Sequence, residues 1–256
     1  MKIKDLLEKK ADQFECVSFI PDDPISVPHR FTKKQDIEIA GLFAAVFAWG
    51  LRKTIIAKAN ELIALMDDSP YEFIMNHTDH DLKRLEKFKH RTFQPPDTLY
   101  FIHRLREMYE EYGSLENAFK DREGTFENLE EGLNQFRKRF FDSPYAPHRT
   151  KKHVPSPERN STVKRLNMYL RWMVRSPERG VDFGIWKNIS PSSLYIPLDV
   201  HVLRVADSLG ILKRNKSDWK AVKELTGFLK KLDENDPVRF DFALFNMGVR
   251  QEFDRF

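Results

Sequence analysis

Apolar side chains recur at helical spacing along almost the whole chain, and this pattern is the strongest constraint on its fold. One such stripe consists of Leu166, Tyr169, Leu170, Met173 and Val174. Strand-like alternation bounded by hairpin turns is absent, and most of the 10 glycines lie where elements are expected to end. The sequence therefore predicts an all-α protein.

Capping residues predict where some of these helices begin. Ser69, Pro70 and Glu72 form the pattern of a capping box, and Ser161 or Thr162 can cap a helix that ends near 175. Residues 142–160 contain four prolines and no apolar period, which predicts a long loop. The other helices are expected near 2–14, 36–49, 52–66, 79–88, 96–112, 114–121, 125–141, 199–209, 217–232 and 236–247.

Length and composition exclude several classes of protein. The 256 residues suffice for one large domain or two small ones, and 41% hydrophobic residues argue against global disorder. A single cysteine, Cys16, excludes a disulfide framework and a cysteine-based zinc site. Because no membrane span or signal peptide is recognisable, we expect a cytoplasmic protein that does not contact membranes.

Basic residues are concentrated between His148 and Arg175, although the net charge of the chain is only +4. This segment contains a single acid, Glu158, and such clustering is typical of proteins that bind a polyanion. A solvated basic loop and helix face would give the same pattern. The cluster consists of Arg149, Lys151, Lys152, Arg159, Lys164, Arg165, Arg171 and Arg175.

The segment IPLDVHVLRVADSLGIL, residues 196–212, places Asp199 where a helix is expected to begin. An aspartate at this position accepts hydrogen bonds from the free amides of the first turn, and the helix dipole favours its charged form. Two interpretations remain open: Asp199 is a helix cap only, or it is a carboxylate that acts on a substrate.

This segment resembles the region of the catalytic aspartate in the helix-hairpin-helix DNA glycosylases, which include endonuclease III and the 8-oxoguanine glycosylases. Upstream, DIEIAGLFAAVFAWGLRKTIIAKANELIALM is similar to the first paired helices of that family, and FDFALFNMGVRQEF to its closing helix. The combination of KRLNMYLRWMVR, VDFGIW and IPLDVHV is even more similar to an uncharacterised bacterial family. The matching residues around Asp199 are Pro197, Val200, His201, Val202, Arg204, Val205, Leu209 and Gly210.

The resemblance implies a two-lobed helical fold with a cleft between the lobes. One lobe would comprise 36–160, and the other 1–35 plus 161–256 with Asp199. The implied partner is double-stranded DNA with a damaged, flipped-out base, bound by a monomer without cofactor or metal. Asp199 would stabilise the positive charge that develops on the sugar as the bond to the base breaks, and would activate the nucleophile.

Some of these glycosylases use a lysine that forms a Schiff base with the sugar. The family's glycine-rich hairpin and its lysine are missing here, because Arg179-Gly180-Val181 occupies that window. Lys164, at the start of the expected 161–175 helix, is the candidate substitute; a lysine that binds phosphate or faces solvent is the alternative. Cysteines for the iron–sulfur cluster of some relatives are also missing. The residues expected to contact nucleic acid are Arg52, Arg149, Lys151, Lys152, Arg165, Arg171 and His201.

Two other functions fit the same residues. A helical module of this fold could bind DNA or RNA without catalysis, and then Asp199 need not lie beside a lysine. A helical scaffold for proteins would show no salt-sensitive binding to DNA and gives no reason for the basic cluster at 148–175.

Overall fold

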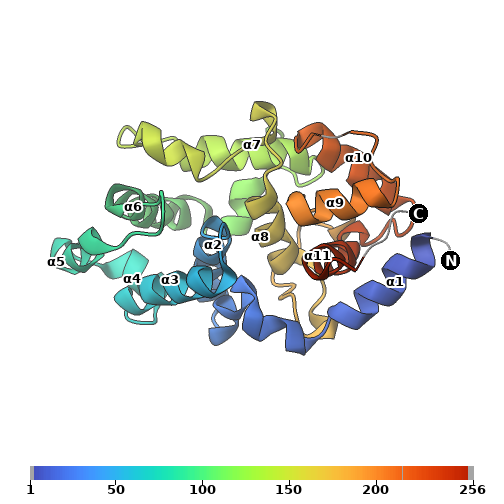
Figure 1. The fold of residues 1–256 in the computed structure, drawn as a ribbon. Helices are drawn as coiled ribbons and strands as arrows, with labels where there is room; N and C mark the ends of the chain where they lie inside the picture. Colours follow the sequence, from blue (N-terminus) through green and yellow to red (C-terminus); the bar gives the residue numbers. More distant parts are fainter. Residues whose placement is uncertain (1–2, 215, 253–256) are drawn as a thin grey trace. The chain divides into compact units, whose positions relative to one another are not determined.

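The computed structural model describes residues 3–214 and 216–252, and within these residues the chain is helical, which confirms the all-α class. Beyond the helices, the described residues contain one isolated bridge, between His90 and Phe93. Figure 1 shows the succession of helices. The α-helices are α1 Ile3–Phe14, α2 Lys34–Val46, α3 Arg52–Leu65, α4 Pro70–Asn76, α5 Asp79–Leu82, α6 Pro95–Tyr112, α7 Leu129–Phe140, α8 Lys164–Val174, α9 Val200–Ser208, α10 Trp219–Lys230 and α11 Asp241–Arg250.

Short 3₁₀ helices occupy several segments where α-helix or loop is expected. The expected helix at 114–121 is the 3₁₀ helix η5 Leu115–Phe119, and the second half of 79–88 is η4 Lys83–Lys87. The expected loop at 142–160 contains η6 His148–Lys152 and η7 Pro157–Arg159.

The chain divides into two compact units, 1–20 with 156–256 and 21–155. The glycosylase-like lobes 36–160 and 1–35 plus 161–256 stay a prediction, and residues 21–35 group with the 21–155 unit. Residues 1–2, 215 and 253–256 of the expected lobes lie outside the described residues.

The core of the 21–155 unit is built around α2, where every residue from Ile37 to Val46 is buried. Rings from α2, α6 and the residues next to them fill this core: Phe43 lies 5.8 Å from Phe101, and Phe47 lies 5.0 Å from Phe93, between ring centroids. The buried carboxylate of Glu38 is held by hydrogen bonds from the hydroxyls of Tyr109 and Ser114. Buried carboxylates need such partners, and here they fix α2 to the end of α6.

The capping box expected at Ser69 is absent from α4. Ser69 makes no side-chain capping bond; instead the Asp36 carboxylate of α2 accepts a hydrogen bond of 2.8 Å from the amide of Tyr71. A free amide of the first turn needs an acceptor, but that acceptor can come from a residue distant in sequence.

In the unit formed by 1–20 and 156–256, α8 is the central helix, and every residue from Leu166 to Val174 is buried. Helix α11 packs on both α9 and α1, and α9 lies beside it in Figure 1. Gly248 of α11 permits this contact, because a Cβ there would lie 2.6 Å from the carbonyl oxygen of His201 in α9.

Candidate active site

Asp199 is the N-cap of α9, as its sequence position predicts. Its Oδ1 accepts hydrogen bonds from the amides of His201 and Val202, at 2.9 and 3.0 Å. Helix α9 begins here because the Asp199 side chain caps its first turn and because Val202 and Val205 turn an apolar face to the core. The cap uses one carboxylate oxygen and leaves Oδ2 for another partner.

That partner is Lys164, the first residue of α8. Its Nζ lies 3.3 Å from Oδ2 of Asp199, and the exposed fractions of the two side chains are 26% and 16%. The two groups come from residues 35 positions apart in the sequence, and the fold brings them into contact. At this distance the ammonium and the carboxylate form an ion pair, and both groups remain accessible to a ligand.

The start of α8 differs from the expectation. Neither Ser161 nor Thr162 caps it; the N-cap is Val163, with φ 51° and ψ 26°, and no side chain caps the first turn. The Ser161 hydroxyl instead accepts a hydrogen bond of 3.2 Å from the Val163 amide.

Arg171 lies about two helical turns beyond Lys164 on α8, and its position corrects the sequence prediction. It was expected to contact nucleic acid, but its side chain is only 4% exposed and pairs with Asp241 and Asp182. The guanidinium carbon also lies 4.3 Å from the ring centroid of Phe242. A residue enclosed in this way has no surface to offer a phosphate, so Arg171 instead fixes α11 against α8.

Arg175 extends this buried network. It pairs with Asp182, Asp236 and Glu15, at 2.5, 2.8 and 2.7 Å. Burial by itself would lower the pKa of Arg175, but the three carboxylates outweigh it and raise that pKa above its usual range. Arg171 and Arg175 are therefore internal, and both are matched by carboxylates.

Asp241, the first residue of α11, is a site residue that the sequence reasoning missed. Burial raises the pKa of its carboxyl to about 6; Arg171 opposes this rise, and the nearby charge of Asp199 adds to it. The network contains more carboxylates than cations, so a proton on Asp241 reduces the excess negative charge beside Lys164 and Asp199. Its only sequence signal is an aspartate at the start of an apolar helix, which is also typical of an ordinary cap.

A family model with the description "Protein of unknown function (DUF2400)" matches residues 23–250. The chain belongs to this family. The expected similarity to an uncharacterised family is thereby confirmed, and the match includes both Lys164 and Asp199. Searches among curated proteins and among solved structures found no match. The relation of this DUF2400 protein to the helix-hairpin-helix glycosylases stays a prediction.

His201 follows the cap of α9 in the DUF2400 chain. Its ring packs against Phe245, with centroids 6.0 Å apart, and its buried Nδ1 has no hydrogen-bond partner among the described residues. Half-buried and packed between α9 and α11, His201 has the environment of a core histidine. Its expected contact with nucleic acid stays a prediction.

The remaining basic residues lie on different elements of the DUF2400 protein. Arg149, Lys151 and Lys152 are exposed on η6 of the 21–155 unit, and Arg149 is anchored 3.3 Å from Oδ2 of Asp97. Arg52 begins α3 in the same unit. Arg165 follows Lys164 on α8, and burial lowers its pKa to about 10, so it remains charged at neutral pH.

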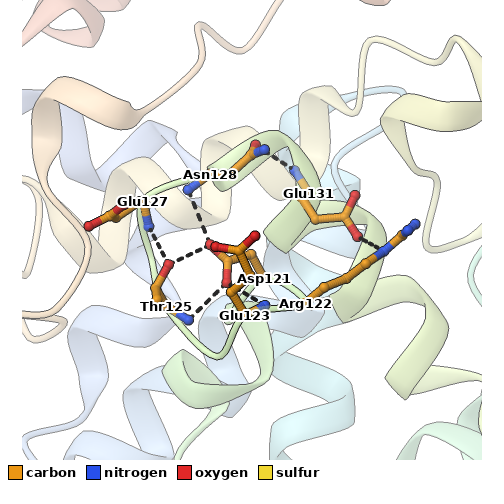
Figure 2. A pocket seen from close by; sticks show the side chains of 7 residues that line it. All are labelled: Asp121, Arg122, Glu123, Thr125, Glu127, Asn128 and Glu131. Atoms are coloured by element: carbon orange, nitrogen blue, oxygen red, sulfur yellow. Dashed lines mark hydrogen bonds and ion pairs between the residues drawn. The ribbon is translucent and has the colours of Figure 1, made fainter.

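A hollow of about 270 Å³ in the 21–155 unit is lined mainly by acidic residues between Asp121 and Glu131 (Figure 2). Asp121 lies at its centre and accepts hydrogen bonds from the amides of Glu123 and Thr125 and from the Thr125 hydroxyl. These bonds, led by the hydroxyl, hold the pKa of Asp121 below its usual range. The carboxylate thus organises the loop that leads into α7, and the hollow contains none of the expected site residues.

No helix within 3–214 and 216–252 is long and apolar enough to cross a bilayer. Within the same residues, no group of three or more His, Cys, Asp or Glu side chains is arranged to hold a metal ion.

Proposed function

We propose that this protein is a DNA glycosylase with lyase activity, in which Lys164 is the nucleophile and Asp199 its proton acceptor and charge stabiliser. The observation that carries the proposal is the 3.3 Å separation between Lys164 Nζ and Asp199 Oδ2. Nothing in the local sequence requires this contact, since the cap needs only Oδ1. Two accessible groups with these chemistries match a reaction that needs an amine nucleophile beside a fixed carboxylate.

In the first step, Asp199 takes a proton from the Lys164 ammonium and leaves a neutral amine. The Nζ lone pair forms a bond to C1′ of the sugar while the bond from C1′ to the base breaks. The electron pair of that bond leaves with the base, which takes the proton from Asp199. Positive charge develops on the sugar in this step, and Asp199, a carboxylate again once it has given up that proton, stabilises it.

In the second step, the attached amine loses a proton and the sugar ring opens. The C1′–O4′ bond breaks, O4′ takes up a proton, and the Nζ lone pair forms the C1′=Nζ double bond of a Schiff base. Loss of a proton from C2′ then expels the 3′ phosphate and cleaves the strand. Asp199 and the released base can accept and return these protons.

The exposed cations of η6 support a nucleic-acid partner. Lys151 and Lys152 are exposed, and the pairing of Arg149 with Asp97 orders the segment that carries them. Such cations position a protein on the phosphate backbone without reading the base sequence.

The test uses a panel of duplexes that each carry one lesion: 8-oxoguanine, uracil, a methylated purine or an abasic site. Base release and strand cleavage are measured for the wild type, Asp199→Asn and Lys164→Gln, with Lys187→Gln as the exposed-lysine control. Asparagine is an equally good helix cap, so Asp199→Asn should fold, bind DNA and lose base release. Lys164→Gln should lose strand cleavage, whereas Lys187→Gln should retain it.

The alternative is a nucleic-acid-binding module in which Asp199 acts only as a cap. It predicts salt-sensitive binding with neither base release nor cleavage across the panel, and equal behaviour of Asp199→Asn and the wild type. That result would refute the proposed reaction.

A further inference from the structure

The backbone is strained immediately before Lys164. Val163 is fully buried and has φ 51° and ψ 26°, in the left-handed region. A β-branched residue in this region is a genuine outlier, because its branched side chain crowds the backbone. Such strain persists only where surrounding contacts hold it, and it is concentrated at functional sites.

Asn167 is the side chain that holds this turn from within α8. Its Nδ2 donates a hydrogen bond of 3.2 Å to the carbonyl oxygen of Thr162, the residue before Val163. Asn167 is only 1% exposed, and its Oδ1 has no hydrogen-bond partner among the described residues. A buried, half-satisfied amide lowers stability, in the middle of a helix whose neighbouring residues Leu166 and Met168 are apolar and buried.

Ordinary capping does not account for this arrangement. Helices α9 and α10 of the same unit begin with Asp199 and Asp218, whose backbones are extended and whose side chains cap the first turn. Helix α8 has no side-chain cap and begins from a left-handed valine. The strained backbone of Val163 and the half-satisfied amide of Asn167 therefore lie within about one helical turn. Lys164 lies between them and is held in position by both.

We propose that Asn167 is a positioning residue: by fixing the left-handed turn at Val163, it holds Lys164 at the start of α8 with Nζ against Asp199. The inference rests on the proposed role of Lys164 as a nucleophile. It adds that the reactivity of Lys164 depends on an amide that touches neither the substrate nor the reacting atoms.

The experiment measures Lys164 without nucleic acid. The folded full-length protein is treated with glycolaldehyde and cyanoborohydride, and the alkylation rate of Lys164 is followed by peptide mass mapping, relative to that of exposed Lys187. Asn167→Ala and Asn167→Leu are compared with Asn246→Ala. Asn246 is the matched control, a buried asparagine of the same unit whose Nδ2 donates 2.8 Å to the carbonyl oxygen of Phe242.

Both Asn167 variants should change the relative rate of Lys164 severalfold, because its Nζ would no longer lie against the carboxylate of Asp199. Asn246→Ala should lower the melting temperature and leave the rate unchanged. Equal Lys164 rates in the wild type and in both Asn167 variants overturn the proposal, whatever their absolute values. An equal change of rate in Asn246→Ala would also overturn it, because the effect would then follow stability alone.

A double-mutant cycle tests the mechanism through Val163. Glycine adopts a positive φ without strain, so in a Val163→Gly background the turn no longer depends on Asn167. Asn167→Ala should therefore have a much smaller effect on Lys164 in that background, and an undiminished effect would refute the role of the turn. Because no DNA is present, this experiment tests the positioning role of Asn167 separately from the glycosylase reaction. A Lys164 that depends on Asn167 in the aldehyde assay, in a protein that releases no base, would refute only the glycosylase reaction.

Discussion

Replacement of Gly248 by alanine tests the packing that holds α9, and with it Asp199, in place. The added Cβ would lie 2.6 Å from the carbonyl oxygen of His201 and 2.8 Å from its carbonyl carbon. These are backbone atoms of α9, so no side-chain rotation can relieve the contact. Helix α9 or α11 must move.

The size of the movement follows from the contact distance. Ordinary contact begins at 3.4 Å, about 0.8 Å beyond the position of the new Cβ. Overpacking of this kind lowers the free energy of unfolding by about 1–3 kcal/mol, and the higher helix propensity of alanine offsets up to about 1 kcal/mol of this loss. We therefore expect Gly248→Ala to lower the free energy of unfolding by about 1–2 kcal/mol and to shift Asp199 away from Lys164.

Gly227 provides the matched control on α10. It is also helical, but a Cβ there would meet nothing within 4 Å, so Gly227→Ala should stabilise the protein by about 0.5–1 kcal/mol. Urea unfolding monitored by circular dichroism gives both values, and aldehyde alkylation reports Lys164. If Gly248→Ala matched Gly227→Ala in stability and left the Lys164 rate unchanged, the reasoning from the α9–α11 contact would be refuted.

Three further predictions address other parts of the protein. Burial raises the pKa of Asp241 to about 6, above its ordinary 3.8, so the folded state keeps a proton that the unfolded chain has lost. Stability should therefore fall by roughly 2–3 kcal/mol as the pH rises from 4 to 6, and urea titrations at several pH values should show that Asp241→Asn removes this dependence. Replacement of Lys151 and Lys152 by glutamine should reduce the slope of log K for DNA against log salt by about 2, measured by fluorescence anisotropy; an unchanged slope would remove η6 from the interface. Asp121→Ala should loosen the loop before α7 and lower the melting temperature by a few degrees, while alkylation of Lys164 stays as in the wild type; a change at Lys164 would contradict a role of Asp121 that is limited to its own loop.

Much of the fold follows from local patterns in the sequence. The stripe on α8, the apolar run of α2 and the cap at Asp199 each depend on residues within one or two turns, and all lie on helices where the sequence predicts them. The predicted capping box at Ser69 is wrong because Asp36, 35 residues before Tyr71, supplies the acceptor for the Tyr71 amide. A local motif carries no information about such a distant competitor.

In the candidate site, too, residue types could be predicted from local sequence, but contacts between distant residues could not. Asp199 and Lys164 are recognisable as residue types in suitable positions, but their contact depends on how α8 and α9 pack. The sequence predicts Arg171 as a surface cation because its partners, Asp182 and Asp241, come from other segments of the chain and are not visible in the local pattern. A buried arginine with two carboxylates has the same sequence signal as an exposed one.

The most direct test of the central claim is borohydride trapping on a duplex with one abasic site, followed by mapping of the cross-linked peptide. The account predicts a covalent adduct on Lys164, lost in Lys164→Gln and retained in Lys187→Gln. An adduct on another lysine, or no adduct from a protein that still binds the duplex, would contradict the assignment of Lys164 as the nucleophile beside Asp199.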